Sequence, residues 1–460
     1  MPSAPRPAIS DLHQALERAL SGGPRSGQQL LESLGISQPT LSRTIRELSA
    51  TVTMFRERGQ RAPQYALLRK LPLGLNPRQR VYRFLSSGHI VPYADLEFLV
   101  GGSTLERQDA GAIRLYDGLP PYMLFAAPSG FLGRQQAQTA ARNQPFPASL
   151  KDWSDDHRIA FLFTQGLNLP GNLIFGDQPL QREMDLLQQP RPPAQDKLDV
   201  YVQLAQQLKN ESYGSSAGGE QPKFLWVAED SGSVIVKFAR LGSRMAELLP
   251  LEHLALSALA DVGVPAAKTQ LLARGEFVFL EVQRFDRVGQ QGRIGMLSAG
   301  AVDDEFFGTR DTWPEFAARC VHEDYFSQQH AEHVGVMAAF SELIGNNDRH
   351  FENISLLIGD DGEYLGIAPA YDILPMRYAP IGGGLDPDLV PIEPKVSTIG
   401  AVPLVWSLAA QAADAFWAAA SHAQLAAPIS AAMRELAVRN RAVAREFAAP
   451  LRQAAATACR

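Results

Sequence analysis

The feature that most restricts the fold of this chain is a polar segment at residues 346–353, Asn-Asn-Asp-Arg-His-Phe-Glu-Asn, with a further acidic residue, Asp372, beyond it. Asp348 and Asp372 supply carboxylate oxygens and Asn353 supplies an amide oxygen, the ligand atoms that hard divalent cations prefer. These side chains can share one cation only if a loop and the end of a later strand meet. The sequence therefore predicts a cation site built from Asp348, Asn353 and Asp372.

The spacing within this segment is typical of phosphotransferases. In protein kinases, an Asp-x-x-x-x-Asn loop uses the aspartate to accept the proton of the substrate hydroxyl and the asparagine to hold magnesium beside the phosphates of ATP. Asp348 and Asn353 have this spacing, and Asp372 fits a second magnesium ligand. We therefore expect ATP and Mg²⁺ as cofactors.

Length and composition are compatible with a multidomain α/β enzyme. A chain of 460 residues exceeds what one hydrophobic core usually serves, so two or three domains are expected. Cys320 and Cys459 are the only cysteines, too few for a disulfide framework or a cysteine-based zinc site. No signal peptide is visible, and no window reaches the roughly 18 unbroken apolar residues that span a bilayer. We expect a cytoplasmic protein without a membrane partner.

The front of the chain carries the pattern of two helices joined by a turn, at residues 26–48. Ser37 is a suitable N-cap for the second helix, and Leu41, Ile45 and Leu48 recur on one face that would meet the core. The residues left toward solvent suit base edges and phosphates; they are Ser37, Gln38, Thr40, Ser42, Arg43 and Arg46. Two short strands then flank a basic loop, where Arg56, Arg58 and Arg61 suit phosphates.

An excess of basic residues in this front segment favours an anionic partner. The net charge is −6, yet residues 41–70 hold seven basic residues against two acidic ones. Residues 1–71 resemble the winged helix-turn-helix domains of bacterial regulators, which implies binding to double-stranded DNA. The alternative is a helical hairpin that docks on the rest of the chain or on a second copy. The basic wing and the polar helix face occur together, which favours DNA.

The middle of the chain, residues 72–195, shows short strands and turns rich in Pro and Gly and no evident chemistry. It ends in a Pro-rich linker, QQPRPPAQDK. We expect an accessory α/β domain.

A glycine-containing segment at residues 215–223 follows, and paired glycines let main-chain amides approach phosphate oxygens. By itself such a pair is more often a hairpin turn. The next strand carries Lys237, placed like the kinase lysine that meets the α and β phosphates, although a lone strand lysine is usually an edge residue. Glu247 or Glu252 on the following helix could form an ion pair with Lys237 and orient it. Glu252 is preferred, because it begins the more regular amphipathic part of that helix.

These motifs, with Arg284-Phe285-Asp286-Arg287, occur in the order and approximate spacing of the HipA family of serine/threonine kinases. The resemblance runs from about residue 71 to the C-terminus, and with the fused front domain the chain looks like the YjjJ (HipH) branch. It implies a two-lobed kinase fold at residues 196–460. The N-lobe would end near residue 298 and a largely helical C-lobe would occupy 299–460. From Ala401 onward, Ala- and Leu-rich helices would complete an all-helical lower lobe.

The resemblance also assigns site residues. Asp348 becomes the catalytic base, Asn353 and Asp372 the magnesium ligands, and Ser215 the autophosphorylated serine, with Ser216 as competitor. The implied ATP-binding residues are Ala217, Gly218, Gly219, Glu220, Gln221, Lys223, Lys237, Gln283, Arg284, Phe285, His350, Phe351, Glu352, Asn353, Tyr371 and Asp372. Gln283 and Phe285 would form the hinge that faces adenine.

Family members are toxins of toxin-antitoxin systems that cause growth arrest and persistence. The resemblance implies a protein substrate, glutamyl-tRNA synthetase or another translation protein, a HipB-like antitoxin and transcriptional autoregulation. A homodimer is expected because helix-turn-helix modules often pair on two half-sites. Two alternatives stay open: a nucleotide-sensing transcription regulator with an inactive kinase-like half, and a nuclease that uses metal-activated water.

Overall fold

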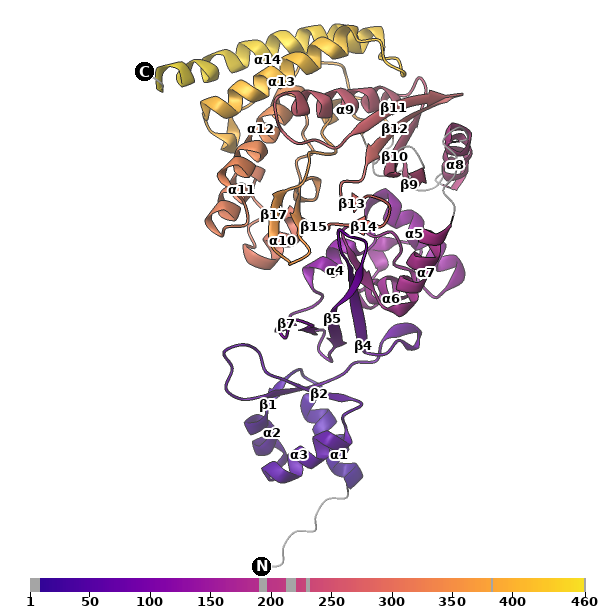
Figure 1. The fold of residues 1–460 in the computed structure, drawn as a ribbon, viewed down its shortest axis with the longest axis vertical. Helices are drawn as coiled ribbons and strands as arrows, with labels where there is room; N and C mark the ends of the chain where they lie inside the picture. Colours follow the sequence, from indigo (N-terminus) through magenta and orange to yellow (C-terminus); the bar gives the residue numbers. More distant parts are fainter. Residues whose placement is uncertain (1–8, 190–196, 212–220, 229–231, 382–383, 459–460) are drawn as a thin grey trace, which may run out of the picture. The chain divides into compact units, whose positions relative to one another are not determined.

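The computed structural model describes residues 9–189, 197–211, 221–228, 232–381 and 384–458. The chain divides into two compact units, drawn as one ribbon in Figure 1. The first unit holds residues up to 188, apart from 86–88 and 129–135, and the second unit holds those two segments and the rest. Within the described ranges, none of the helices combines the length and apolar character needed to cross a membrane.

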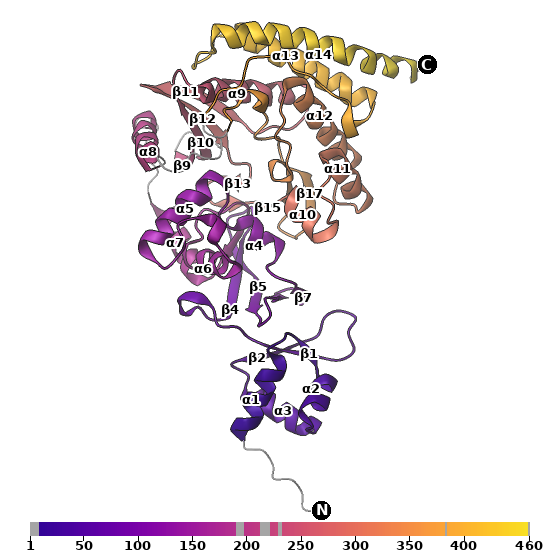
Figure 2. The ribbon, with the colours of Figure 1, turned by 180° about the vertical axis from the view of Figure 1, so that it is seen from behind.

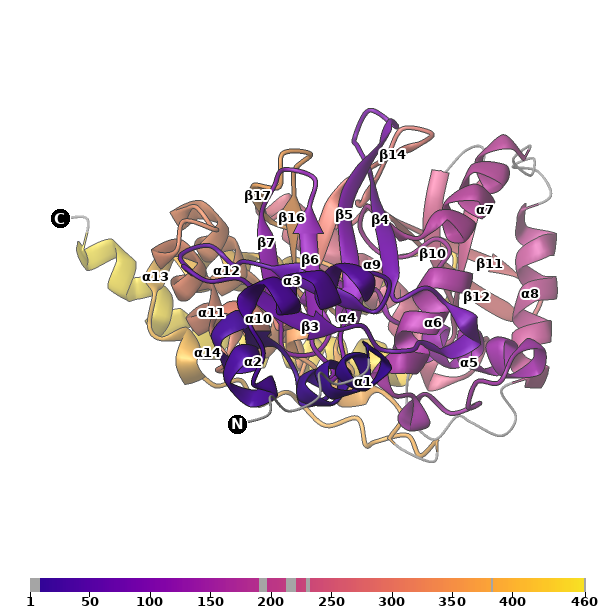
Figure 3. The same cartoon turned by 90° about the horizontal axis from the view of Figure 1, so that it is seen from below.

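Residues 9–70, the described part of the front segment, form three α-helices and a small antiparallel sheet of strand order β1-β3-β2. Leu16, Leu30 and Leu41 are fully buried between the helices. Leu41 faces the core as predicted, and Ile45 and Leu48 on the same helix face are partly buried against it. Ser37 precedes the second helix of the pair, and Pro39 lies in its first turn. Figure 3 shows these helices from below. The elements are α1 (Ile9–Leu20), β1 (Arg25–Ser26), α2 (Gly27–Leu34), α3 (Gln38–Glu47), β2 (Val52–Phe55) and β3 (Gln64–Leu67).

The middle segment forms a five-stranded antiparallel sheet of order β7-β6-β5-β4-β8, whose strands β4 to β7 stand side by side in Figure 3. Its strands are β4 (Arg78–Phe84), β5 (Ile90–Phe98), β6 (Thr104–Gln108), β7 (Ile113–Tyr116) and β8 (Leu173–Phe175). Its helices are α4 (Pro121–Ala126), α5 (Gly130–Asn143), α6 (Asp155–Gln165) and α7 (Asp177–Gln188). An α/β domain was expected here, but the sequence pattern located none of its helices, because α5 and α7 are polar and lack a long apolar stripe.

The front and middle segments pack together within the first unit. Leu68 forms a β-bridge with Leu99, and Phe55 and Ala66 join the same buried cluster. At this junction the carboxylate of Glu97, 6% exposed, accepts a hydrogen bond of 2.6 Å from the hydroxyl of Thr53. The hairpin of β2 and β3 is therefore fixed to the middle segment by residues of both strands, while the arginines of its loop stay exposed.

The second unit begins with helix α8 (Lys197–Glu211) and a four-stranded antiparallel sheet of order β11-β12-β10-β9. The strands are β9 (Lys223–Ala228), β10 (Gly232–Arg240), β11 (Thr269–Arg274) and β12 (Phe277–Gln283). Helix α9 (Arg244–Asp261) packs on this sheet through Leu249 and Ala246. The apolar residues of β12 are buried on both faces, as its unbroken hydrophobic run predicts.

The rest of the second unit is mainly helical. Helices α13 and α14 lie side by side and α13 also packs on α12, as Figures 1 and 2 show from opposite sides. The helices are α10 (Ala299–Phe306), α11 (Trp313–His322), α12 (Gln328–Ile344), α13 (Pro403–His422) and α14 (Ala431–Ala458).

The expectation of an all-helical lower lobe was wrong. A two-stranded hairpin, β13 (Arg287–Val288) with β14 (Gly292–Arg293), precedes this part. A three-stranded sheet lies inside it, made of β15 (Gly295–Ser298), β16 (Ser355–Ile358) and β17 (Tyr364–Ile367). The strands are short, and β15 pairs with a strand far along the chain, so local periodicity does not reveal them.

Candidate functional site

The ammonium group of Lys237 on strand β10 is held by two carboxylates. Its Nζ lies 2.6 Å from Oε1 of Glu252 on helix α9, and it also forms an ion pair with Asp372. Burial works against the charged ammonium, but Asp372 and Glu252 outweigh it, so the pKa of Lys237 lies above its ordinary value. Lys237 therefore stays positively charged at neutral pH, and its two carboxylate partners fix the position of its ammonium group.

The preference for Glu252 over Glu247 as the partner of Lys237 is confirmed. Glu252 is fully buried beneath the sheet. Glu247, on another face of the same helix, accepts a hydrogen bond of 3.0 Å from the main-chain N–H of Ser430 and pairs with Arg244 at 3.3 Å. The two glutamates thus have separate structural roles.

Asp372 lies in the loop after β17 with a main-chain φ of +54°. This left-handed conformation is uncommon for a residue other than glycine, and such strained residues cluster at functional sites. Burial would raise the pKa of its carboxyl, but the charges of Lys237 and Lys223 hold the pKa below its ordinary range. Asp372 is therefore a carboxylate at neutral pH.

The loop after α12 is cross-linked around Asp348. Helix α12 ends at Ile344 and is capped by Gly345, whose φ is +76°, so that the chain turns into the loop. The Oδ1 atom of Asn346 accepts the main-chain N–H of Asp348 at 3.1 Å, and Nδ2 of Asn353 donates to the carbonyl oxygen of Asp348 at 2.8 Å. Both sides of Asp348 are thus held in place, while its side chain is 46% exposed.

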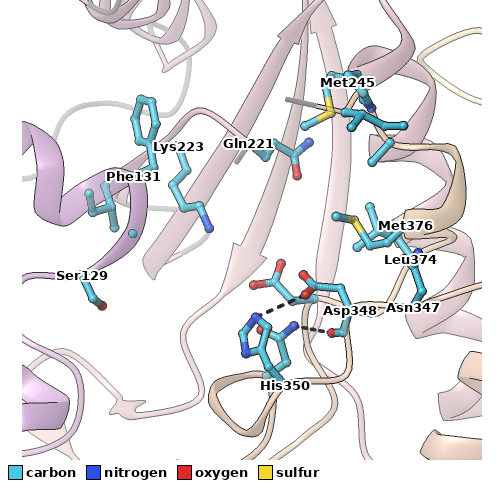
Figure 4. A pocket seen from close by; sticks show the side chains of 17 residues that line it. Ser129, Phe131, Gln221, Lys223, Met245, Asn347, Asp348, His350, Leu374 and Met376 are labelled. Atoms are coloured by element: carbon cyan, nitrogen blue, oxygen red, sulfur yellow. Dashed lines mark hydrogen bonds and ion pairs between the residues drawn. The ribbon is translucent and has the colours of Figure 1, made fainter. Parts of the chain in front are cut away.

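One cavity of about 840 Å³ brings together residues from these separate elements. Figure 4 shows Lys223 and Gln221 directed into the space that Asp348 and His350 face. Apolar side chains, among them Met245, line another part of its wall. The residues on the wall that the sequence predicted are Gln221, Lys223, Asp348, His350, Asn353 and Asp372.

The donor atoms in this cavity fit a magnesium ion. Because Asn353 uses its amide nitrogen on Asp348, its amide oxygen is left for another partner. Asp372 adds an ionised carboxylate on the same wall. No cluster of three His, Cys, Asp or Glu side chains with metal-binding geometry occurs among the described residues. One carboxylate and one amide suit Mg²⁺, which takes few protein ligands and completes its shell with water and phosphate oxygens.

Comparison with known proteins yields two family matches. Residues 75–184 match the YjjJ-like toxin, middle domain, and residues 215–446 match the HipA-like C-terminal domain. A relative from Escherichia coli (strain K12), "Toxin YjjJ", is 33% identical over 406 residues, covering 86% of this chain and 90% of the relative. The chain belongs to the HipA family, in its YjjJ-like branch. The resemblance stated from the sequence motifs is therefore confirmed.

Two solved structures resemble this YjjJ-like chain more distantly. HipA of Shewanella oneidensis MR-1, solved with HipB and operator DNA, has a TM-score of 0.49 and 14% identity, covering 82% of this chain and 99% of HipA. The proinflammatory kinase CtkA of Helicobacter pylori has a TM-score of 0.37 and 10% identity, covering 52% of this chain and 97% of CtkA.

The structure does not place the expected hinge of this HipA-family chain on the cavity wall. The side chain of Arg284 is buried and makes two bonds, of 2.9 and 2.7 Å, to the carboxylate of Asp286. The main-chain N–H of Gln283 donates to Lys268, and that of Arg284 donates to Ser233. Phe285 packs its ring on Tyr371. These N–H groups are used within the fold.

Three residues near Asp348 have positions that differ from the expected cavity lining. The ring of Phe351 points into the core against Phe316, because residues 351–353 form a tight helical turn. The hydroxyl of Tyr371 lies 2.7 Å from that of Ser355, so it supports β16. Glu352 faces Arg310. Ser215, Ser216, Ala217, Gly218, Gly219 and Glu220 lie outside the described residues.

A chain of ion pairs that the sequence did not reveal leads to Asp348. His350 Nε2 lies 3.6 Å from Asp348, and His350 Nδ1 lies 3.2 Å from Glu352. Glu352 in turn lies 2.6 Å from Nη1 of Arg310. The buried carboxylate of Asp303 holds the main-chain N–H of Arg310 at 2.8 Å. Arg310 is far from Glu352 in the sequence and follows no periodic pattern, so only the fold shows the contact.

Proposed function

We propose that this chain is an ATP- and Mg²⁺-dependent serine/threonine protein kinase and a toxin of a toxin-antitoxin system. The observation that carries the proposal is the presence of Asp348, Asn353 and Asp372 on one cavity wall, next to the buried pair of Lys237 and Glu252. A base, two oxygen ligands for a cation and a fixed lysine are the parts that phosphoryl transfer requires.

In the proposed reaction, a serine or threonine hydroxyl oxygen attacks the γ-phosphorus of ATP. A new O–P bond forms, the bond from the γ-phosphorus to the bridging oxygen breaks, and ADP leaves. Asp348 accepts the hydroxyl proton, and its main chain is held by Asn346 and Asn353. Lys223 on the cavity wall is placed to neutralise phosphate oxygens, and Lys237, held by Glu252, directs a second positive charge toward Asp372.

Asn353 and Asp372 would hold magnesium, which supplies positive charge to the phosphate oxygens as negative charge shifts to the leaving group. Asp372 now pairs with Lys237. Because a carboxylate has two oxygens, Asp372 can keep one on Lys237 and offer the other to the cation.

We propose further that residues 1–71 are a winged helix-turn-helix domain that binds double-stranded DNA and regulates transcription of the protein's own operon. The exposure of the predicted DNA-contacting side chains supports this proposal. On α3, Gln38, Ser42, Arg43 and Arg46 are exposed, while Thr40 is partly covered and its hydroxyl lies 2.9 Å from that of Ser37. Arg56, Arg58 and Arg61 on the hairpin loop are also exposed. Helix residues would meet base edges and hairpin arginines the phosphates.

The remaining parts of the proposal follow the family resemblance. They are autophosphorylation at Ser215, a protein of translation such as glutamyl-tRNA synthetase as substrate, a HipB-like antitoxin as partner, and a homodimer on DNA. A relative named as a toxin supports the growth-arrest role.

The test is phosphate transfer by the purified chain with radiolabelled ATP, Mg²⁺ and a bacterial lysate. Asp348→Asn should lower labelling by at least roughly 10²–10³-fold, the usual worth of a general base, while fluorescent ATP still binds. Asp386→Asn is the matched control, because Asp386 is exposed and is not among the residues that line the cavity. If the wild type labels neither itself nor any lysate protein, the kinase proposal fails. Nicking of plasmid DNA by wild type but not by Asp348→Asn would identify a nuclease instead.

A further inference from the structure

The chain that follows Asp372 forms part of the wall of the cavity of about 840 Å³. We call residues 373–381 and 384–396 the post-Asp372 segment. Its side chains on the cavity wall are Leu374, Met376, Ala379, Pro380 and Ile381. Figure 4 shows Leu374 and Met376 among the side chains that line the cavity. Any movement of this segment would therefore change the cavity in which Asp348 lies.

We propose that the hydrogen-bond network of Tyr378 and Asn440 permanently holds the post-Asp372 segment in place, so that the proposed kinase needs no phosphorylation of this segment to be active. The inference rests on the proposed function. In many protein kinases, phosphorylation orders the loop after the magnesium-binding aspartate through new ion pairs with arginine. Here no serine or threonine occurs between Asp372 and Ser397, and the one tyrosine between them, Tyr378, is fully buried.

The network joins two parts of the segment to helix α14. Nδ2 of Asn440 donates to the hydroxyl oxygen of Tyr378 at 2.9 Å, and this hydroxyl donates to the carbonyl oxygen of Val390 at 2.9 Å. The main-chain N–H of Ile392 donates to Oδ1 of Asn440 at 3.0 Å. Burial raises the pKa of Tyr378, so its hydroxyl keeps the proton that it donates. Because Asn440 and Tyr378 are fully buried, breaking these bonds would leave polar groups without water, which is unfavourable.

The same residues also cover the start of the loop that carries Asp348. The main-chain N–H of Arg377 donates to the carbonyl oxygen of Gly345 at 2.9 Å. A Cβ added at Gly345 would lie 3.0 Å from Cγ2 of Ile392, so the Ile392 side chain packs directly over this glycine. The position of the post-Asp372 segment is thus tied to the position of the Asp348 loop.

A second link lies at the end of the segment. The main-chain N–H of Lys395 donates to Oε2 of Glu342 on α12 at 3.2 Å. The other oxygen of Glu342 lies 2.5 Å from Nη2 of Arg349, the residue directly after Asp348. Glu342 therefore connects the end of the segment to the same loop.

The composition of the segment limits its freedom before any bond forms. It contains five prolines, Pro375, Pro380, Pro387, Pro391 and Pro394. Each proline fixes its own φ, which lowers the conformational entropy that is lost when the chain becomes ordered. A few buried hydrogen bonds can therefore hold this segment without an added phosphate.

The experiment compares wild type with Tyr378→Phe, which keeps the ring and removes the hydroxyl at the centre of the network. Tyr201→Phe is the matched control. Tyr201 is also fully buried, its hydroxyl donates to Glu281 at 2.8 Å, and it is not among the residues that line the cavity. Hydrogen exchange of residues 384–392, melting temperature, phosphate transfer and the affinity for fluorescent ATP are measured for each protein. Phosphate transfer by the wild type is also measured after treatment with a general protein phosphatase.

In Tyr378→Phe we expect amides of residues 384–392 to exchange roughly tenfold faster and kcat for phosphate transfer to fall roughly tenfold, with ATP affinity unchanged. Tyr201→Phe should lose a similar amount of thermal stability yet keep the kcat and the exchange rates of wild type. Phosphatase treatment should not lower the activity of wild type.

The inference is overturned if Tyr378→Phe keeps the kcat of wild type, if both variants lose activity equally, or if phosphatase treatment abolishes phosphate transfer. In each of these cases the untreated wild type transfers phosphate, so the proposed function survives. A wild type that labels neither itself nor any lysate protein ends both.

Discussion

The Nζ atom of Lys237 lies 2.6 Å from Oε1 of Glu252, and neither side chain is more than 5% exposed. This ion pair joins strand β10 to helix α9. The ammonium group of Lys237 also forms an ion pair with Asp372. A buried lysine with two carboxylate partners keeps its charge and its direction without any ligand. The phosphate-binding end of the proposed site is therefore preorganised.

Glu252→Gln should weaken catalysis more than folding. The amide keeps the volume of the carboxylate, and Lys237 retains Asp372 as a counterion. The direction of the ammonium is lost, so kcat/KM for phosphate transfer should fall roughly 10- to 100-fold, as expected for small misplacements in an active site. Glu247→Gln, on the same helix but bonded to Ser430, is the control. Equal activities of the two variants would contradict a positioning role for Glu252.

Gly300→Ala should lower phosphate transfer without lowering the stability of the fold. A Cβ at Gly300 would lie 2.5 Å from Oε1 of Glu352 and 2.7 Å from Nη1 of Arg310. Both atoms are at the ends of flexible side chains, so they can move away at little cost, and alanine favours the helix. The pair that holds His350 beside Asp348 would then separate, and phosphate transfer should fall about tenfold with the melting temperature nearly unchanged.

The control for this variant is Gly22→Ala, where an added Cβ meets no atom within 4 Å. Activity equal to wild type in Gly300→Ala would show that the ion pairs leading to Asp348 are not needed. A large drop in melting temperature would show instead that Arg310 and Glu352 serve the fold.

His350, which belongs to the same chain of ion pairs, should have a pKa above its ordinary value. The hydrogen bond to Glu352 raises the pKa of His350, and the same bond lowers the pKa of Glu352 to about 2. The stability from a raised histidine pKa is fully present below about 6.5 and is lost as pH rises through the folded pKa. The stability from Glu352 is present above its ordinary value near 4.5 and is lost as pH falls.

The pair therefore stabilises most between these two ordinary values, by less than about 1 kcal/mol because both side chains are half exposed. Proton NMR of the histidine rings measures the effect. The His350 signal, identified by its absence in His350→Gln, should titrate above about 6.5 in wild type and move to lower pH in Glu352→Gln. An unchanged midpoint in Glu352→Gln would rule out this hydrogen bond as the cause.

Sequence reasoning identified the parts of the site that follow from residue type and order. Asp348, Asn353 and Asp372 line one cavity, as predicted from the kinase-like spacing of their motifs. Glu252 was preferred because it begins the cleaner amphipathic part of the helix, and the structure pairs it with Lys237.

Other features depend on contacts between distant residues. Arg310 meets Glu352 only because helix α10 and the loop after α12 come together, and nothing around either residue encodes this. The pairing of β15 with β16 is equally non-local. Phe351 points inward because a tight helical turn rotates its side chain, and the sequence spacing of Asp348 and Asn353 does not fix that rotation.

Glu97→Ala should loosen the junction between the front hairpin and the middle sheet. Glu97 accepts bonds from Thr53 at 2.6 Å and from Nε of Arg78 at 3.1 Å, and it pairs with Arg107 at 3.5 Å. Removing the buried carboxylate takes an acceptor from each of these partners, although both arginines keep bonds to main-chain carbonyls of the front segment. The loss of hydrogen bonds to a buried charged group costs about 2–3 kcal/mol. Amides of β2, β3 and β5 should then exchange hydrogen roughly 100-fold faster, while those of β10 and β12 in the second unit keep their rates.

Asp95→Ala on the same strand is the control, because its ion pair with Arg80 is 45% exposed on the aspartate side. An exposed pair of this kind contributes about 0–1 kcal/mol, so exchange in β2 and β3 should barely change. If Glu97→Ala leaves those amides as protected as in Asp95→Ala, the front hairpin is held by the apolar contacts of Phe55, Leu68 and Leu99 alone. The Glu97 cluster would then contribute only to the pairing of strands within the middle sheet.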